Sequence, residues 1–473
     1  MAGSVQVSPG AQITPAPSQV ALPTNYITNF DFLNQYLPDT YAEEFERYGN
    51  RSIASFLRLV GSEYPTNSDM IKWSEQGRLH TKYTDITTLV ADGVGTTQAL
   101  FTVAGGVCTF RVGQTVFLSD NAADISAKAV ITAVNTGVAG NFTAAYYSSA
   151  GQPTGFQAST AITAFVYGSE FRKGSDGMVG SLEAESEFFD NKTIILKDKY
   201  EVSGSDMAQI GWVKVTTENG ADGFYWFIKS EHETRLRFED YLEMSMVEGV
   251  QADFGSGAEA ELSDNSAAGT VNAGTQGMFE SIETRGNVWD GGNPETMTEW
   301  DEMMARLDKQ GSIRENVLFL NREFSNDLND MIAAQNSYGA GGTSYGLFNN
   351  SEEMAINLGF DGFKRGYEFY KTDWKYLNDA TLRGGLVGGA INGVMVPAGS
   401  MTIYDQVLGQ NATRPFLHVR YRASEHTDRK FRTWVTGGAG DAQTNDTDTM
   451  SVNYLSERAL CTMGANNFFV FKG

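Results

Sequence analysis

The sequence is short of the residues that build most disulfide frameworks, metal sites and catalytic centres. Its 473 residues include only two cysteines, four histidines and ten prolines. Cys108 and Cys461 lie far apart, and no histidine stands at a metal-ligand spacing from another. We therefore predict no disulfide framework, no zinc site and a reducing compartment. Because the sequence also shows no Walker A loop, no dinucleotide-binding turn and no convergent set of nucleophile, base and orienting groups, we predict no metal ion, no cofactor and no catalytic residue.

Long apolar runs are also missing. No stretch of about 18 apolar residues occurs, so nothing is predicted to span a membrane. Residues 1–25 lack the charged start and the continuous apolar stretch of a signal peptide. Four prolines within them favour an extended, polyproline-like arm instead. We expect a soluble intracellular protein.

Basic residues are outnumbered, at 35 Lys and Arg against 58 Asp and Glu, which gives a net charge of −23. Because phosphate contacts need clustered Lys and Arg, this balance argues against a general electrostatic footprint for nucleic acid. What is abundant is apolar and turn-forming: 41% hydrophobic residues, 12% aromatic residues and 51 glycines. A chain of this length and composition is predicted to fold into two to four packed units.

One long charged segment stands out. Gly223–Gly249 contains no Pro and no interior Gly, which predicts a helix about 40 Å long. Its middle, Lys229–Arg237, is polar on every side, so the helix either crosses solvent or meets something outside its own fold. An ordinary surface helix is the alternative. Two Glu-before-Arg pairs at i, i+4 are predicted to stabilise the middle, namely Glu231 with Arg235 and Glu233 with Arg237.

Between Val94 and Gly168 the sequence carries only four charged residues, and short apolar runs alternate with Gly, Asn and Asp turns. This pattern predicts a separate small β-barrel or sandwich inserted into the surrounding fold. Further along, Met278–Thr284 is predicted to be a strand.

From Pro294 the pattern predicts a helix, a strand and a second helix. Thr296 with Glu299 three residues later forms a capping box, and Gly311 suits the C-terminal end of that helix. Asn316–Leu320 is predicted to be a buried strand. Asn321 is placed to cap the next helix.

Two patterns resemble catalytic or metal-binding motifs. Gly342–Gly346 matches G-x-S-x-G and would make Ser344 a hydrolase nucleophile, but the motif needs a strand before it and a helix after it. Its low-complexity context favours a flexible loop. Asp441, Asp446 and Asp448 could collect a divalent cation, yet a solvated acidic loop is the better interpretation because the EF-hand glycine and glutamate are missing.

One region departs from the acidic balance. Six basic residues lie between Arg414 and Arg432, and Arg420 and Arg422 share one strand face with His418. A solvated strand face is one interpretation. The other is an interface that meets acidic surface on a neighbouring copy, because Arg forms bidentate pairs with carboxylates. Contact with DNA is a third and less favoured option.

The order of these elements resembles that of a known family. An extended arm precedes a strand-rich excursion, one long helix, a helix–strand–helix segment and terminal strands. This is similar to the major capsid proteins of tailed bacteriophages, with the Hong Kong ninety-seven-type shell fold. Residues 453–460 (NYLSERAL) and 464–471 (GANNFFVF) look like the ending of capsid proteins from crAss-like gut phages and their podovirus relatives. The resemblance covers roughly residues 25–473.

The resemblance implies an α+β tailed-phage capsid fold: a peripheral domain with a long spine helix, an axial domain, and an extended loop over the adjacent subunit. The inserted β-barrel or sandwich module is additional to the minimal fold. The implied domains are an extended N-terminal arm at 1–30, an N-terminal helical segment at 31–67, an extended loop at 68–90 and 170–203, the inserted β module at 91–169, a peripheral domain at 204–293 and 436–473 with the spine helix at 223–249, and an axial domain at 294–435. Met278–Thr284 and the final strands would complete the peripheral sheet.

The function that the resemblance implies is a non-enzymatic subunit that self-assembles into an icosahedral head shell around phage DNA. Implied partners are copies of itself in pentamers and hexamers, a scaffolding protein, a portal protein and head auxiliary or decoration proteins. Packaged DNA is touched non-specifically at most. The protein would be made in the host bacterial cytoplasm and reside in the virion. Candidate inter-subunit contacts are Glu231, Glu233, Arg235, Arg237, Arg420 and Arg422. An encapsulin-type cellular compartment is the structural alternative, and a serine hydrolase using Ser344 is the alternative from another class.

Overall fold

The structure is a computed structural model. It describes residues 56–57, 62–88, 96–120, 122–135, 140–156, 159–184, 186–208, 215–216, 222–223, 226–262, 273–311, 313–336, 362–405, 410–439 and 443–473. The chain forms two compact units. The first contains Ile195–Glu243 and Phe431–Ser456, and the second contains Phe56–Ile194, Met244–Lys430 and Glu457–Gly473. Each unit has buried hydrophobic clusters of its own.

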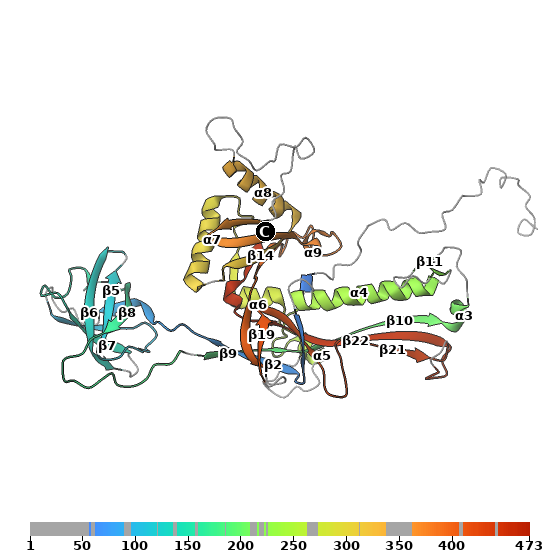
Figure 1. Cartoon of the computed structure of the whole chain (residues 1–473), viewed down its shortest axis with the longest axis horizontal. Coiled ribbons are helices and arrows are strands. Elements are labelled where there is room, and N and C mark those ends of the chain that lie inside the picture. The colour runs from blue at the N-terminus through green and yellow to red at the C-terminus, as the bar shows by residue number, and fades with distance from the viewer. Residues whose placement is uncertain are drawn as a thin grey trace, which may run out of the picture. The chain divides into compact units, whose positions relative to one another are not determined.

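The first unit is built on the long helix. The helix α4 (Trp226–Glu248) runs alongside long strands (Figure 1), with Phe238 and Leu242 packed on Val452 and Tyr454. The rings of Phe238 and Tyr454 stack at 5.7 Å between centroids. The strands of this unit are β10 (Ile194–Ser203), β21 (Arg432–Gly437) and the first half of β22 (Thr449–Thr462), and the smaller elements are α3 (Gly204–Met207), β11 (Val215–Thr216) and β12 (Asp222–Gly223). β22 hydrogen-bonds to both β10 and β21.

The predicted helix is confirmed, but its polar middle is not exposed on every side. Thr234 is 7% exposed, and Glu231 and Glu233 are half-buried, whereas Arg235 and Arg237 are exposed. A helix with one face against a sheet must bury one residue per turn there, whatever that residue's polarity. Thr234 can be buried at this position because its hydroxyl donates a hydrogen bond to the carbonyl of Ser230 at 2.9 Å.

The second unit contains a six-stranded mixed sheet in the order β13-β23-β17-β14-β16-β15. Its strands are β13 (Asn287–Trp289), β14 (Glu315–Leu320), β15 (Gly362–Arg365), β16 (Tyr367–Asp373), β17 (Ile391–Pro397) and β23 (Phe469–Lys472). The central strand β14 runs parallel to β16 and antiparallel to β17. Around it lie α6 (Met278–Arg285), α7 (Met297–Gln310), α8 (Arg322–Asn336), α9 (Lys375–Asn378) and the short 3-10 helix η4 (Ala465–Asn467). The same unit also contains the short helix α5 (Gly257–Leu262).

Both faces of this sheet are covered. α7 and α8 place Trp300 and Phe324 against Leu318 and Leu320 on one face. On the other face the ring of Phe319 contacts Phe56 edge-to-face, with centroids 4.6 Å apart. A strand covered on both sides needs the continuous apolar run that the sequence shows. The buried-strand prediction at 316–320 is therefore confirmed.

The predicted helix ends are confirmed as well. Thr296 and Glu299 form the reciprocal capping box, and Gly311 ends α7 in the left-handed conformation at φ 71°. Asn321 caps α8 by accepting the Phe324 N–H at 2.8 Å. The strand predicted at Met278–Thr284 is wrong, because these residues form α6. Met278, Phe279 and Ile282 are spaced to bury one face of a short helix, which a short apolar run alone does not distinguish from a strand.

A second sheet of this unit joins β1 (Ser62–Thr66) in parallel to β20 (Leu417–Arg422), which pairs with the second half of β22. The helical segment predicted at 31–67 is wrong at its C-terminal end, because Ser62–Thr66 form the strand β1. Pro65 removes a backbone donor and is tolerated in an edge strand. The rest of that segment lies outside the described residues, apart from helical Phe56 and Leu57. A two-stranded pair, β18 (Ser400–Asp405) with β19 (Gln410–Pro415), completes this region.

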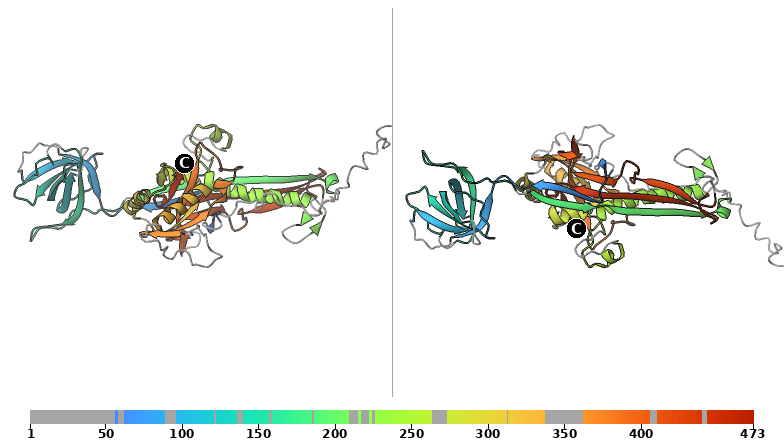
Figure 2. Two further views of the ribbon diagram at one scale, coloured as in Figure 1. Left: turned by 90° about the horizontal axis from the view of Figure 1, so that it is seen from above. Right: turned by 90° about the horizontal axis from the view of Figure 1, so that it is seen from below.

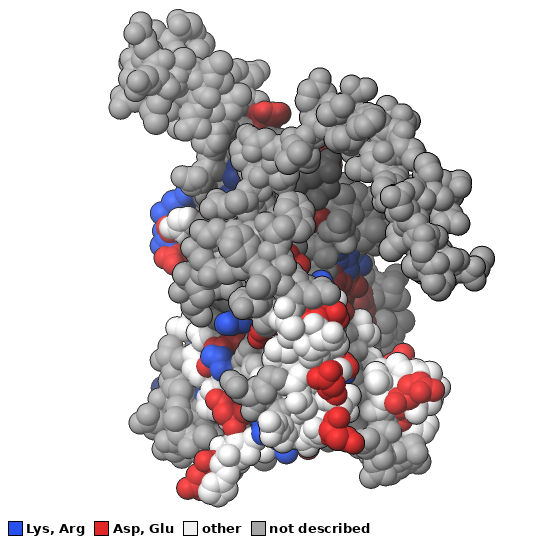
Figure 3. All heavy atoms as spheres, turned by 90° about the vertical axis from the view of Figure 1, so that its right-hand side faces the viewer, with Lys and Arg blue, Asp and Glu red and all other residues white. Residues whose placement is uncertain are grey.

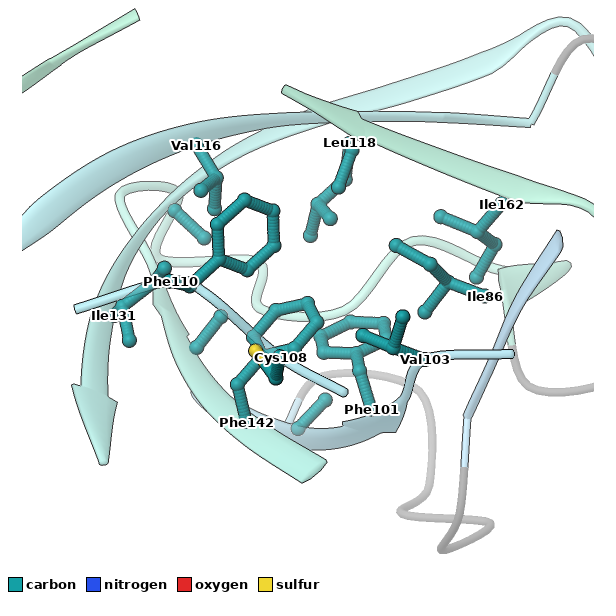
Figure 4. Packing of buried hydrophobic residues seen from close by; sticks show 14 of the residues in the cluster. Ile86, Phe101, Val103, Cys108, Phe110, Val116, Leu118, Ile131, Phe142 and Ile162 are labelled. Atoms are coloured by element: carbon teal, nitrogen blue, oxygen red, sulfur yellow. The ribbon is translucent and has the colours of Figure 1, made fainter. Parts of the chain in front are cut away.

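The inserted module is a closed six-stranded barrel in the order β3-β4-β7-β6-β5-β8. Its strands are β3 (Lys82–Thr88), β4 (Gln98–Thr102), β5 (Gln114–Asp120), β6 (Ile125–Asn135), β7 (Asn141–Tyr146) and β8 (Ile162–Ser169). Figure 2 shows these strands curling into a barrel. Figure 4 shows that core, where the ring of Phe142 stacks on Phe101 at 5.2 Å and meets Phe110 edge-on at 5.1 Å. A closed barrel leaves no strand edge unpaired, and the inner face of this one buries a hydrophobic core of its own.

Three strands lie elsewhere than the implied domains put them. β3 belongs to the barrel, not to the extended loop at 68–90, because it pairs with β4 and β8. β23 pairs with β13 and β17, so the chain end completes the six-stranded sheet instead of the sheet beside α4. β20, placed in the range 294–435, pairs with β1 and β22. Long-range pairing of this kind has no local signal in a sequence.

Candidate functional site

The feature best suited to binding another chain is a two-stranded ribbon. β2 (Met70–Gln76) and β9 (Ser186–Lys192) pair with each other in antiparallel register. Trp73 lies opposite Phe189, and Ser74 lies opposite Phe188. Because side chains alternate, one face of the ribbon packs inward while the other carries Phe188, which is 72% exposed. A lone two-stranded ribbon with an outward aromatic ring is marginal unless something covers it.

The inward face fixes the root of the ribbon. Trp73 packs on Cys461 and Met463, and the Arg285 guanidinium lies 4.4 Å from the Phe189 ring centroid. Asn191 is 1% exposed and fully hydrogen-bonded: its amide nitrogen donates to the carbonyls of Leu460 and Gln276, at 2.7 and 2.8 Å. Its amide oxygen accepts the Gln276 N–H at 2.8 Å. The root of the ribbon is therefore held by both apolar packing and hydrogen bonds.

Beyond the root, the two segments that lead to the barrel expose further apolar side chains. Leu79 is 77% exposed, Val179 is 86% exposed, and Leu182 and Phe171 are 41% and 42% exposed. Scattered exposed apolar residues are ordinary, but here they follow one continuous stretch of ribbon and linker. This stretch can bury substantial apolar area against a partner.

A second exposed apolar point lies in the turn after α9. Val387 is 94% exposed and Leu386 is 49% exposed. The turn is held firmly: Arg383 forms a two-point ion pair with Glu248, with Nη2 to Oε2 at 2.6 Å, and donates through Nη1 to the Gly389 carbonyl at 2.8 Å. Tyr376 also donates its hydroxyl to Glu248, at 2.5 Å. The valine is thus presented on an ordered turn.

The four predicted contact residues of α4 have mixed surroundings. Arg235 pairs with Glu239, one turn after it, at 3.3 Å, whereas the predicted partner Glu231 lies one turn before it; its guanidinium lies 5.9 Å from the Phe431 ring centroid. Glu231 acts electrostatically on Tyr454, whose pKa is raised to about 12, mainly by burial. Arg237 is exposed. Glu231 and Arg235 thus each have a partner within their own unit, and whether any of the four also meets a neighbouring subunit stays a prediction.

The predicted arginine face on β20 is not a solvated face. His418 is 1% exposed, and burial, with Arg414 and Arg420 nearby, lowers its pKa to about 4 although Nδ1 lies 3.1 Å from the Pro415 carbonyl. Burial likewise lowers the pKa of Arg420. Arg422 forms ion pairs with Asp69 and with Glu457, the latter at 3.2 Å. Whether either arginine also meets a neighbouring copy stays a prediction.

A buried carboxylate organises this region, and the sequence patterns did not reveal it. Glu457 is 5% exposed and pairs with Arg422 and Arg429, the latter at 2.5 Å. Thr193 donates its hydroxyl to the same carboxylate at 3.3 Å. A second carboxylate, Glu63, pairs with Lys430 at 2.5 Å and with buried Arg458 at 3.2 Å. Many of the basic residues in this stretch thus serve the fold itself.

The other candidates do not gather into a site. Ser344 and its motif lie outside the described residues, as does Asp441. No group of three or more potential metal ligands occurs in the part of the chain that the structure describes. Of the helices it describes, none has the length and apolarity to cross a membrane. On the face drawn in Figure 3, the described Lys and Arg side chains lie among Asp and Glu and form no continuous basic patch.

Comparison with known proteins gives likenesses of structure alone. No protein-family model and no curated protein sequence matches the chain. The chain is similar to the mature capsid of bacteriophage PhiM1, with 9% identity, a TM-score of 0.40 and coverage of 97% of this chain and 98% of that one. The capsid of cyanophage P-SCSP1u gives 8% identity, a TM-score of 0.40 and coverage of 97% and 98%. The capsid of the native GTA particle gives 8% identity, a TM-score of 0.37 and coverage of 92% and 95%. These values carry no residue-level correspondence.

Proposed function

We propose that this chain is a non-enzymatic shell subunit, the major capsid protein of a tailed phage, which self-assembles into an icosahedral head. The observation that supports this most directly is the ribbon of β2 and β9. It is rooted firmly by Trp73 and Asn191, yet exposes Phe188 and continues into exposed Leu79 and Val179. An anchored arm with an apolar outer face suits a protein that completes its packing on a neighbouring copy.

The finer layout follows from this proposal. The unit with α4, β10, β21 and the first half of β22 would be the main part of the peripheral domain, with α4 as its spine. The six-stranded sheet with α7 and α8 would be the axial domain, and the turn carrying Val387 would point toward capsomer centres. The ribbon would be the extended loop, with the barrel inserted at its end. Repeated contacts of this kind close rings of five and six.

Partners are part of the proposal. Besides copies of itself, the shell would use a separate scaffolding protein and a portal, and auxiliary proteins could bind its surface. Of the six predicted contact residues, Arg237 is the one whose exposure best suits contact with another subunit. Arg420 and Arg422 are too engaged in their own chain to serve as a clean test, since reversing their charge would disturb the pairing of Glu457.

The test is assembly of the purified full-length chain, alone and with its scaffolding protein, followed by mass photometry and negative-stain microscopy. We expect closed shells or capsomers. Phe188→Asp should reduce assembly at least about tenfold, because a charge would then enter an apolar contact. Ser186→Asp adds the same charge to the same ribbon face and is the matched control. A wild-type chain that stays monomeric under every condition would contradict the proposal.

A further inference from the structure

The strand β21 forms an open edge of the sheet in the first unit. It pairs with β22 from Arg432 opposite Leu455 to Gly437 opposite Met450, and β22 is its one strand neighbour within the described residues. Figure 1 shows β22 between β10 and β21, in agreement with that pairing. The outer row of backbone N–H and C=O groups of β21 is thus not paired with a strand in the part of the chain that the structure describes.

The helix α4 covers β22 but does not cover β21. Val452 and Tyr454 of β22 are 3% and 2% exposed, because they pack on Phe238 of α4. Val435 lies directly opposite Val452 on the same face of the sheet, yet it is 41% exposed. Thr433, opposite Tyr454, is exposed as well. On this face, therefore, β21 lies beyond the helix.

The other face of β21 carries an exposed tryptophan. Trp434 is 37% exposed, and the Arg432 guanidinium lies 5.6 Å from its ring centroid. Asn453, which lies opposite Trp434 on β22, donates from its side-chain amide to the Thr436 hydroxyl at 3.0 Å. Trp and Arg are enriched at binding hot spots. With Val435 on one face and Trp434 on the other, β21 has exposed apolar surface on both sides.

The strand at the opposite edge has the protection that β21 lacks. β10 alternates half-buried and exposed side chains, and its exposed face carries Lys197, Lys199 and Glu201. Lys199 and Glu201 form an ion pair. Charged side chains, lysine above all, keep an edge strand from pairing with another chain. In β21 the only charged residue is Arg432 at its start, and Thr, Trp and Val, which favour strands, make up the rest before Gly437.

The distribution of charge favours a second copy as the partner. No Asp or Glu occurs between Asp428 and Asp441, and β22 carries no charge from Thr449 to Tyr454. Two chains that each carry a net charge of −23 repel one another, so they approach most easily where acidic side chains are absent. We propose that β21 pairs in antiparallel register with β21 of a second copy about a two-fold axis, which joins the two sheets into one.

The sequence of β21 is compatible with pairing to itself. In a register centred on Trp434 or on Val435, Arg432 of one copy faces an uncharged residue of the other, so no like charges meet. The inference goes beyond the proposed shell function and does not need it, because two copies can pair without closing a shell.

The first test is a cysteine scan of the full-length chain in whichever state it purifies. Thr433→Cys, Trp434→Cys and Val435→Cys are each oxidised and separated on a non-reducing gel. Opposite residues of antiparallel strands have Cα atoms about 4.5–5.5 Å apart, within the reach of a disulfide. A two-fold axis brings only one position opposite its own copy, so one variant should form the covalent dimer at least about tenfold faster than the other two.

Controls separate this contact from random collision. Ile195→Cys on β10 is 53% exposed and should stay monomeric on the gel, as should the wild type, whose Cys108 and Cys461 are buried. Val435→Lys, added to the fastest variant, should slow the covalent dimer at least about tenfold, because lysine protects a strand edge. Ile195→Lys adds the same charge to the other edge and should leave the rate unchanged. Urea unfolding shows whether Val435→Lys folds; if it does not, the scan alone decides.

Two results refute the pairing: no covalent dimer at any of the three positions, or equal rates at all three. Val435→Lys with a wild-type rate would also refute it. Negative-stain microscopy scores shells separately. Wild-type shells without a β21 dimer would overturn the pairing and leave the shell function standing. Covalent dimers from a chain that never forms shells would support the pairing and contradict the shell function.

Discussion

The buried imidazole of His418 predicts a specific dependence of stability on pH. The side chain is 1% exposed, and its ring meets Tyr64 edge-on at 5.7 Å, with Arg414 and Arg420 nearby. The pKa is lowered to about 4 by burial first and by the two arginines second, although the Pro415 carbonyl opposes the shift. An unfolded chain would titrate near the ordinary value of about 6.5.

The direction in which stability changes with pH follows from proton uptake by the unfolded chain. Below about pH 6.5 the unfolded chain binds a proton that the folded chain refuses until about pH 4, so stability falls as the pH falls through this window. At one pH unit below the ordinary value, near pH 5.5, the loss relative to neutral pH is about 1 kcal/mol. Most carboxylates are still ionised at that pH, which isolates the histidine.

The assay is urea unfolding of the unassembled subunit, followed by tryptophan fluorescence at pH 7 and near pH 5.5. Wild-type protein should lose about 1 kcal/mol more between the two conditions than His418→Gln does. His80→Gln changes an exposed histidine and should keep the wild-type pH dependence. Equal pH dependence of wild type and His418→Gln would refute the reasoning, because His418 would then not be buried in its neutral form.

Three further substitutions test the packing. Glu457→Gln should destabilise the second unit by about 3 kcal/mol, because Arg422 and Arg429 lose their shared carboxylate; urea unfolding measures this. Trp300→Ala should cost about 3–5 kcal/mol, because its ring, 1% exposed, packs 5.0 Å from Phe363; unchanged thermal unfolding would contradict this. Thr296→Ala should cost about 1 kcal/mol through loss of the α7 cap, whereas exposed Thr284→Ala should not.

Sequence reasoning succeeded where the signal was local. The absence of Pro and Gly predicted α4, and the caps at Thr296, Gly311 and Asn321 were each found in place. The barrel was predicted from a run of short alternating segments with few charges. The strand predicted at Met278–Thr284 was wrong, because these residues form α6 and a short apolar run fits a helix as well as a strand. Helix caps and periodicity depend on neighbours within a few residues, so the sequence alone determines them.

The exposure of the candidate contact residues, in contrast, depends on residues far away in the sequence. Phe188 and Phe189 are adjacent in sequence, and which ring points outward depends on the register of β9 against β2. Arg420 and Arg422 look like a basic surface in the sequence, but Arg422 meets Glu457 and Asp69 only because β1, β20 and β22 come together.

The sequence by itself determined that this chain has a long uninterrupted helix, a low-charge β module and capped helices on an acidic, cysteine-poor background. The tertiary structure alone decided which strands pair, which arginines form ion pairs within the chain, and which aromatic rings are exposed to solvent. The physical reason is the range of the interactions. Hydrogen bonds and caps within a helix join residues a few positions apart, whereas burial and strand pairing join residues such as Glu63 and Arg458, which only the folded chain brings together.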